Sequence, residues 1–391
     1  MKIVHIITRL ILGGAQENTL ITCRVLAERG HDVTLITGPA IGPEGQLFEQ
    51  AAEGDYKIIM IKSLRRAINP LLDTISYRQI KKRLKQIQPD IVHTHSAKAG
   101  ILGRLAAWSL KGKFPDRKKP HVAHTIHGLA FHPYLGKLRN AFYIAIERFA
   151  GKRTDAFLCV ADAMTQKARA AGIGKKASFT TAYSAIEEDD FIMPSDPRKI
   201  NDFRRKYGIS TEAVVLVTIA RLAELKGHEY IIESAKTLSA EFPDCVWLFV
   251  GNGYLANRIK ADILLANLGY KFKFTGLLPP EVIPLAIHAS DILVHCSLRE
   301  GLARVLPQAM LCAKPTVSFD IDGAKEVVNE NTGRLIEPEN VDQLTEACRE
   351  LIADRELCRT LGENSKRSVM QKFAPETMVD TIERVYKELA G

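Results

Sequence analysis

The chain has 391 residues, a formal net charge of +9, 46% hydrophobic residues and 25% charged residues. These proportions are ordinary for a globular protein and argue against a disordered, collagen-like or coiled-coil chain. No apolar run approaches the roughly 18–20 residues of a membrane-spanning helix. At about 100–200 residues per domain, the length predicts two domains.

The charge is distributed unevenly along the chain. Residues 1–185 contain 29 Lys and Arg against 13 Asp and Glu, a balance of +16, whereas residues 186–391 contain 25 against 32, a balance of −7. This asymmetry predicts two surfaces with different partners. The seven cysteines include no CxxC pair, so we expect reduced, mostly buried thiols in a cytoplasmic protein.

Short apolar, β-rich runs alternate with helical patterns through both halves. This alternation predicts βαβ units and therefore an α/β fold with parallel sheets. The strands predicted for the first half are residues 2–8, 31–37, 57–61, 90–95, 121–127 and 156–161. The strands predicted for the second half are residues 214–220, 246–251, 272–276, 292–297 and 315–319.

The acidic segment 187–200 interrupts this series. It contains two prolines and lacks a periodic pattern of apolar residues. This composition predicts a linker, and the strand–helix series on either side of it predicts two Rossmann-like domains that face a central cleft. We place the N-terminal domain at residues 1–188 and the C-terminal domain at residues 200–374. Apolar residues at helical spacing predict a final helix over residues 376–391 that packs back on the N-terminal domain.

Two glycine-rich strings follow predicted strands. Gly13 and Gly14 precede a helix, where glycines permit close approach of a ligand and free N–H groups attract phosphate; an ordinary tight turn is the alternative. Gly251 and Gly253 belong to a GxGxxA string. The acidic residue expected about 20 positions later in an NAD fingerprint is absent, so we interpret this string as a nucleotide-facing or purely structural βα turn.

Charged residues follow two strands of the second half. Arg221 and Lys226 come directly after residues 214–220, at the strand end where open α/β sheets bind ligands. A guanidinium and an ammonium there suit a diphosphate, although a solvated loop has the same pattern. Glu300 precedes a loop and a predicted helix. Its carboxylate suits sugar hydroxyls, and a Glu before a helix is also an ordinary start signal.

The spacing of the histidines between residues 93 and 127 does not suit a single zinc site, which needs three or four convergent ligands. The triplet at residues 320–322 is a DxD string that we interpret as a polar strand-end loop. We therefore expect no metal ion and no cofactor. His127, at a strand end, is the histidine that we expect to be functional; the others are expected to be structural.

Taken together and in this order, these strings resemble the retaining glycosyltransferases of family 4, which have the GT-B fold. The resemblance covers nearly the whole chain and includes HTHSAKAGILGR, HTIHG, ARLAELKG, VGNG, FTG and REGLARVLPQAM. The stretches THSAKAGILGRLAA and HTIHGLAFHP are similar to members that build bacterial polysaccharides or lipopolysaccharide. The resemblance implies a nucleotide-sugar donor, with a UDP-sugar favoured, in the C-terminal half and a glycan or lipid-linked acceptor in the N-terminal half.

The resemblance also implies roles for individual residues. Arg221 and Lys226 match the pair on the donor diphosphate, Glu300 matches the first acid of the E-x7-E motif on the sugar hydroxyls, and His127 matches the histidine near the donor sugar. Gly14 lies in the loop that borders the diphosphate. The remaining donor-binding residues expected from the resemblance and the strings above are Gly251, Gly253, Gly301, Leu302, Ala303, Arg304 and Gln308.

Three positions depart from the family pattern. The second acid of E-x7-E is Gln308, a neutral amide that can still contact ribose hydroxyls. Leu302-Ala303 replaces the usual residues after Glu300-Gly301, and Ser184-Ala185 stands where many members have an NG or SG turn. The family mostly retains the anomeric configuration without a metal ion and without a clear protein nucleophile. Two alternatives stay open: a nucleotide-sugar epimerase of the same fold, and an inactive sugar-binding subunit.

The basic N-terminal half suggests a further partner, an anionic membrane surface on the inner face of the cytoplasmic membrane. In residues 76–88, Ile80, Leu84 and Ile87 share one helical face among several cations, and a second basic cluster spans residues 111–119. This pattern predicts a peripheral membrane contact, with simple core packing of the apolar face as the alternative. No aromatic residues are interleaved with these charges, so nucleic acid is not an expected partner.

Overall fold

The computed structural model describes residues 1–41, 45–110, 120–192 and 196–391. The chain divides into two compact units, each described by itself below. Unit 1 comprises Met1–Ala185 and Ala374–Gly391, and unit 2 comprises Ile186–Phe373.

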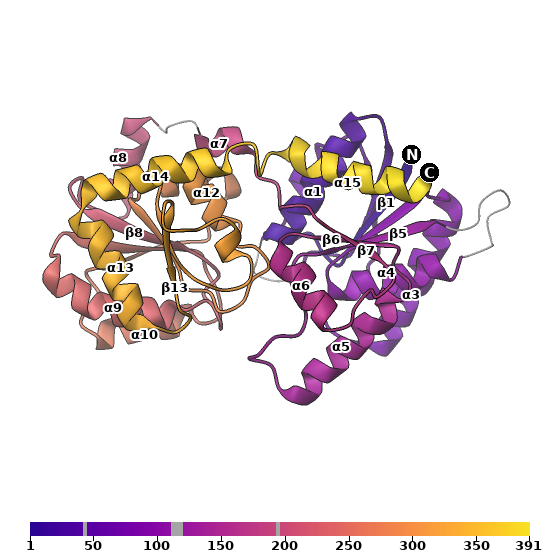
Figure 1. Ribbon diagram of the computed structural model, residues 1–391, viewed down its shortest axis with the longest axis horizontal. Coiled ribbons are helices and arrows are strands. Elements are labelled where there is room, and N and C mark those ends of the chain that lie inside the picture. The colour runs from indigo at the N-terminus through magenta and orange to yellow at the C-terminus, as the bar shows by residue number, and fades with distance from the viewer. Residues whose placement is uncertain (42–44, 111–119, 193–195) are drawn as a thin grey trace. The chain divides into compact units, whose positions relative to one another are not determined.

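Unit 1 is built on a seven-stranded parallel sheet with helices on both faces (Figure 1). The strand order is β3-β2-β1-β4-β5-β6-β7. The strands are β1 (Lys2–Ile7), β2 (Asp32–Thr37), β3 (Lys57–Met60), β4 (Ile91–His95), β5 (His121–Ile126), β6 (Ala156–Cys159) and β7 (Ser178–Thr181). The helices are α1 (Gly14–Glu28), α2 (Phe48–Ala52), α3 (Pro70–Ile87), α4 (Ala97–Trp108), α5 (Lys137–Gly151), α6 (Asp162–Ala170) and α15 (Pro375–Ala390).

The two faces of this sheet have separate cores, because alternate residues of a strand point to opposite faces. Ile3 and Ile7 of β1 pack in a core with α1 and α15, whereas Val4 and Ile6 pack in a core with α3 and α4. Helix α15 begins with Pro375, whose fixed φ suits the first turn of a helix. It buries one face against the first core through Met378, Val379, Ile382, Val385 and Tyr386.

Unit 2 is built on a six-stranded parallel sheet of order β10-β9-β8-β11-β12-β13. The strands are β8 (Val214–Ile219), β9 (Cys245–Val250), β10 (Phe272–Gly276), β11 (Ile292–His295), β12 (Thr316–Phe319) and β13 (Gly333–Ile336). The α-helices are α7 (Glu188–Ile192), α8 (Pro197–Lys206), α9 (His228–Glu241), α10 (Ala256–Leu265), α11 (Ile283–His288), α12 (Val305–Leu311), α13 (Val341–Ala353) and α14 (Arg355–Val369), and two 3₁₀ turns are η1 (Pro280–Val282) and η2 (Ala324–Glu326).

The predicted α/β fold with two Rossmann-like parallel sheets is confirmed. All eleven strands expected from the sequence are present, with ends that differ by one or two residues. Two strands were not predicted, β7 and β13, which lie at sheet edges and have four residues each. An edge strand packs against one neighbour only, so it needs less of the apolar, β-branched pattern that marks a central strand.

The segment 187–200, predicted to be a linker, contains α7 and the beginning of α8 in its described part, and Phe191 is buried. One expectation about another segment needs correction. The apolar face of α3 is not available to a membrane, because Ile80 and Leu84 are fully buried against the sheet. The alternative interpretation of α3, core packing, is therefore the correct one. The basic cluster at residues 111–119 lies outside the described residues.

The described residues form no helix that is both long enough and apolar enough to cross a bilayer. All seven cysteines are free thiols, and all except the half-buried Cys358 are buried. Burial raises the pKa of six of these thiols, to about 12 at Cys245 and Cys312; the other four are Cys23, Cys296, Cys348 and Cys358. The expectation of reduced, mostly buried thiols is confirmed.

Candidate active site

Each sheet has one point where the strand order changes direction. In unit 1 it lies between β1 and β4, and in unit 2 it lies between β8 and β11. Loops leave a sheet in opposite directions at such a switch point, which opens a crevice beyond the carboxyl ends of the strands where ligands bind. The predicted site residues follow strands at or next to these two points.

Lys226 and Glu300 form an ion pair at the switch point of unit 2. Lys226 follows β8 and Glu300 follows β11, so the pair joins two loops that are distant in the sequence. The Oγ of Ser297 also donates to Oε1 of Glu300, at 2.7 Å. Nε2 of the buried His295 lies 3.8 Å from the same oxygen. Neither His295 nor Ser297 was predicted as a site residue, although they occupy alternate positions at and just after the end of β11.

The surroundings of Glu300 keep its carboxylate ionised. Burial by itself raises the pKa of Glu300, but the charge of Lys226, the nearby His295 and the hydrogen bonds from Lys226 and Ser297 bring it below its usual value. Burial, with a further contribution from Lys226, lowers the pKa of His295 to about 4 despite the attraction of Glu300. At neutral pH the pair therefore consists of one carboxylate and one ammonium beside a neutral imidazole.

Asp322 holds the backbone of Glu300 in place. The N–H of Glu300 donates to Oδ2 of Asp322 at 2.7 Å. Asp322 has a φ of 50°, a left-handed conformation that an Asp side chain tolerates better than most. The expected polar strand-end loop at residues 320–322 is thus present, and its second carboxylate orients the loop that carries Glu300.

Close contacts between loop backbones explain three glycines of unit 2. A Cβ at Gly227 would lie 2.0 Å from the carbonyl oxygen of Cys296. A Cβ at Gly251 or Gly253 would lie 2.1 or 2.2 Å from the carbonyl oxygens of Ala220 or Leu222. No side chain fits at these distances, so the loops after β8, β9 and β11 pack together only because these positions are glycine. This accounts for Gly251 and Gly253 structurally; their role in donor binding stays a prediction.

The loop after β8 presents its two cations from a strained backbone. Arg221 is exposed and Lys226 is half-buried. Leu225 between them has a φ of 63°, and its carbonyl accepts from the N–H of Leu298 at 2.9 Å. This bond holds the loop after β8 against the loop after β11.

The segment after Glu300 is largely enclosed. Gly301, Leu302 and Ala303 are buried, and the carbonyl of Gly301 accepts from the N–H of Gly323 at 3.0 Å. Arg304 occupies the N-cap position of α12, and Gln308 lies one turn further along that helix; both side chains are half-buried. The structure therefore brings the predicted donor-binding residues of unit 2 to one end of one sheet.

The remaining predicted residues belong to unit 1. Gly14 is the exposed first residue of α1, which follows β1. His127 is half-buried and follows β5, and its Nε2 lies 3.1 Å from Nδ1 of His95 at the end of β4. His127 is thus connected to the switch point between β1 and β4.

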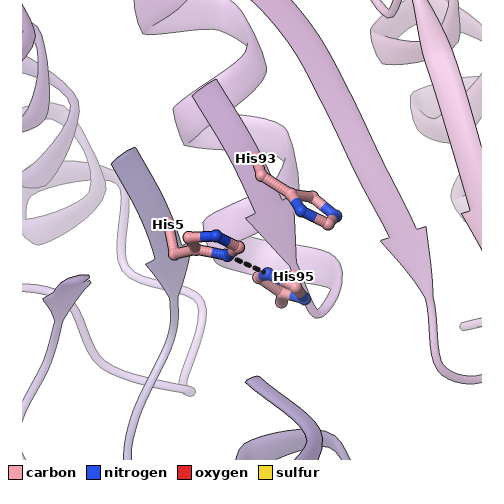
Figure 2. A group of neighbouring side chains, drawn as sticks. All are labelled: His5, His93 and His95. Atoms are coloured by element: carbon pink, nitrogen blue, oxygen red, sulfur yellow. Dashed lines mark hydrogen bonds between the residues drawn. The ribbon is translucent and has the colours of Figure 1, made fainter. Parts of the chain in front are cut away.

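A group of buried histidines lies beside His127, and the sequence analysis missed it. His5 of β1 stands opposite His93 of β4 in the parallel register, and His95 lies two residues further on the same face (Figure 2). Period-two spacing alone places His93 and His95 together. Only the strand order adds His5, because β1 and β4 pair directly in the sheet although β2 and β3 come between them in the sequence.

Comparisons with known proteins agree with this arrangement. Residues 12–179 match the family described as Glycosyltransferase Family 4, and residues 199–368 match the family described as Glycosyl transferases group 1. The chain belongs to these GT-B glycosyltransferases. The two matched regions of the glycosyltransferase contain the predicted residues of unit 1 and unit 2, respectively.

Relatives of the glycosyltransferase align over nearly the whole chain. The UDP-Gal:alpha-D-GlcNAc-diphosphoundecaprenol alpha-1,3-galactosyltransferase of Escherichia coli is 28% identical over 100% of this chain and 97% of its own. The N-acetyl-alpha-D-glucosaminyl L-malate synthase of Bacillus anthracis is 23% identical over 93% and 91%. The crystal structure of Anabaena HepE in complex with UDP has a TM-score of 0.80 at 20% identity, over 99% of this chain and 100% of its own.

Proposed function

We propose that this glycosyltransferase moves a sugar from a nucleotide-sugar donor, preferably a UDP-sugar, to a glycan or lipid-linked acceptor in the synthesis of a cell-surface polysaccharide. The observation that carries the proposal is the Lys226–Glu300 pair at the switch point of unit 2. An ammonium and a carboxylate that neutralise each other there suit a ligand with an anionic diphosphate and a neutral, hydroxyl-rich sugar. The UDP-Gal in the name of the Escherichia coli relative and the UDP in the Anabaena structure support the choice of donor.

Different residues contact the diphosphate, the sugar and the ribose of the donor. Arg221 and Lys226 stabilise the diphosphate, where negative charge develops as the sugar leaves. Glu300 accepts hydrogen bonds from sugar hydroxyls, and charged acceptors form the stronger bonds. Gln308 contacts the ribose through its amide, and the backbone of residues 301–304 approaches the diphosphate.

The reaction retains the anomeric configuration in this proposal. The bond from the anomeric carbon to the diphosphate oxygen breaks, and the bond to the acceptor oxygen forms on the same face of the sugar. The acceptor's proton passes to an oxygen of the leaving diphosphate, so no protein nucleophile and no metal ion are needed. From the family resemblance, we assign His127 to the donor sugar and Gly14 to the loop that borders the diphosphate.

The experiment is a donor and acceptor panel. Purified protein is incubated with UDP-, GDP- and ADP-sugars, and release of the nucleoside diphosphate is measured with and without GlcNAc-diphosphoundecaprenol, the acceptor named for the Escherichia coli relative. Acceptor-dependent release and an axial anomeric linkage in the product's NMR spectrum support the proposal. Interconversion of the donor sugar without release would indicate the epimerase, and neither reaction would indicate an inactive binding subunit.

A specific surface supports a lipid-linked acceptor. On α5, Leu138 is 89% exposed and Phe142 is 55% exposed, and Phe149 continues the same stripe at helical spacing. Exposed cations flank the stripe, and the one acidic residue of the helix, Glu147, is buried in an ion pair with Arg104 at 2.8 Å. We infer that α5, in place of α3, contacts an anionic membrane surface, because its apolar stripe and its charge both suit such a surface.

A further inference from the structure

Three imidazole rings form a continuous hydrogen-bonded row in unit 1. Nδ1 of His5 lies 2.9 Å from Nε2 of His95, and Nδ1 of His95 lies 3.1 Å from Nε2 of His127. The rings of His5 and His95 are stacked, with centroids 5.2 Å apart and planes 16° apart. Figure 2 shows His5 and His95 facing each other across the end of the two strands. The row runs from the fully buried His5 to the half-buried His127.

The buried rings of this row are neutral. Burial lowers the pKa of His5 to about 3, and burial together with the neighbouring histidines lowers the pKa of His95 far below its usual value. A neutral imidazole carries one N–H and one acceptor nitrogen. The hydrogen bonds of the row must therefore all point the same way, either from His5 toward His127 or in reverse.

The end of the row at His5 decides between the two directions. Nε2 of His5 is buried and has no hydrogen-bond partner among the described residues. If the bonds ran from His127 toward His5, this nitrogen would carry a buried N–H without an acceptor. In protein backbones, buried N–H groups without acceptors are rarer than under-satisfied carbonyl acceptors, and we apply the same order to the imidazole nitrogen. The row therefore runs outward, and Nε2 of His5 carries no hydrogen.

We propose that His5 and His95 are positioning residues that hold His127 as the Nδ1–H tautomer. His5 donates to His95, and His95 donates to Nε2 of His127, so the ring hydrogen of His127 resides on Nδ1. This inference rests on the proposed function, in which His127 faces the donor sugar. In that role, His127 donates a hydrogen bond to an oxygen of the sugar. His5 and His95, which lie within the sheet, set both the orientation and the tautomer of its ring.

The same geometry argues against a metal ion in this cluster. Ring nitrogens of His5, His93 and His95 lie within 4.8 Å of one another. Both nitrogens of His93 are occupied, by the hydroxyls of Tyr386 and Thr125, and both nitrogens of His95 belong to the row. A zinc ion would have to replace these bonds in order to gather three ligands.

The direct test is nitrogen NMR of the full-length protein labelled with [15N]histidine. Long-range couplings distinguish the two tautomers of each neutral ring, and loss of one signal set in His127→Gln assigns His127. We expect an Nδ1–H ring at His127 in the wild type. An Nε2–H ring there, or stoichiometric zinc in the purified protein, would overturn the proposal.

Two substitutions of His95 separate positioning from packing. In His95→Asn, the amide nitrogen takes the position of Nδ1 and can still donate to His127. In His95→Gln, the amide takes the position of Nε2, so only the contact with His5 is kept. We expect His95→Asn to keep the tautomer and kcat close to wild type. We expect His95→Gln to give a mixture of tautomers at His127 and a fall in kcat of about tenfold or more, by analogy with partners that orient metal-bound histidines.

The controls make the outcomes distinct. His124→Asn changes an equally buried histidine on the opposite face, where Asn can keep the bond that Nδ1 of His124 makes with Thr94 at 2.8 Å, and should leave the tautomer of His127 unchanged. Equal effects of His95→Asn and His95→Gln on tautomer and kcat would contradict the proposal. If the tautomer is as expected but His127→Gln retains full activity, the row stands and the proposed role of His127 in sugar transfer fails.

Discussion

The ammonium of Lys226 and the carboxylate of Glu300 are ion-paired between loops that follow β8 and β11, 74 residues apart in the chain. Neither residue is fully exposed, so each partly compensates the desolvation of the other. In the proposed function, a donor that binds at this point supplies a diphosphate for Lys226 and hydroxyl groups for Glu300. The pair thus keeps the site preformed and electrically balanced before the donor arrives.

Removal of either cation of the loop after β8 should slow transfer. We expect Arg221→Ala and Lys226→Ala each to lose about 2–4 kcal/mol of transition-state stabilisation, since a preorganised charge on the leaving group is lost. At about 1.4 kcal/mol per factor of ten, kcat/KM falls roughly 30- to 1,000-fold. The control is Lys236→Ala, which removes an exposed cation paired with Glu233 on α9. Wild-type rates in both loop variants would refute the assignment.

Glu300 and Gln308 should affect different parts of the donor. Glu300→Gln keeps the shape of the side chain but weakens hydrogen bonds to sugar hydroxyls and leaves Lys226 without its carboxylate. We expect a large fall in kcat with little change in the Kd of the nucleoside diphosphate. Gln308→Ala should instead raise that Kd, measured by calorimetry. The opposite pattern would show that the two roles are exchanged.

Transfer should not depend on a divalent cation. The proposed mechanism stabilises the leaving diphosphate with Arg221, Lys226 and loop N–H groups, and Asp322 already accepts from the backbone of Glu300. We expect activity to survive excess EDTA after dialysis. Loss of activity on chelation that Mn²⁺ or Mg²⁺ restores would contradict this prediction and would indicate Asp320 and Asp322 as candidate metal ligands.

The buried histidines predict a loss of stability in mild acid. In the unfolded chain a histidine binds a proton below about pH 6.5, whereas burial holds the pKa of His5 at about 3 and lowers that of His124 well below its usual value. The unfolded state then binds more protons, so the free energy of unfolding decreases as the pH falls from 6.5 toward 4. Each such histidine contributes up to about 1.4 kcal/mol per pH unit.

Denaturant unfolding at several pH values measures this slope. His124→Asn keeps a partner for Thr94 but removes one buried titrating group, so its slope should be shallower than that of the wild type. His121→Asn, at the half-buried start of β5, is the comparison and changes a ring that is not enclosed. A wild-type slope in His124→Asn would mean that this ring is not neutral in the folded protein.

The membrane contact should depend on α5 and not on α3. We expect wild-type protein to co-sediment with phosphatidylglycerol vesicles at low salt and to be released at high salt, because each cation near an anionic surface contributes about 1 kcal/mol and salt screens it. The double variant Leu138→Ser, Phe142→Ser should bind weakly without any change in charge. Reversal of the α3 cations Lys81 and Lys82 to Glu should weaken binding less.

A matched control for α5 comes from unit 2. Leu264 and Leu265 of α10 are also exposed apolar residues, and their change to Ser should leave sedimentation unchanged. If the wild type stays in the supernatant at low salt, or if the α5 and α10 variants behave alike, the α5 stripe is not a membrane contact. A glycan acceptor in solution would then replace the lipid-linked one.

The sequence by itself determined the two parallel sheets and the strings at their strand ends. Central strands such as β8 are buried on both faces, so their continuous apolar runs are readable without any structure. The loops that carry Arg221, Lys226 and Glu300 follow such strands directly, and parallel strands bring their carboxyl ends to one edge. Position along the chain was therefore enough to predict that these residues gather at one end of a sheet.

Only the tertiary structure decided which of these residues touch. The order of strands in a sheet is set by long-range pairing, which no local pattern records, so the pairing of Lys226 with Glu300 and the row from His5 through His95 to His127 were not predicted. The same limit explains the wrong prediction for α3. An amphipathic pattern shows that a helix has an apolar face, but it does not show what covers that face. The rest of the chain decides this: the apolar face of α3 packs on the core, whereas that of α5 stays exposed.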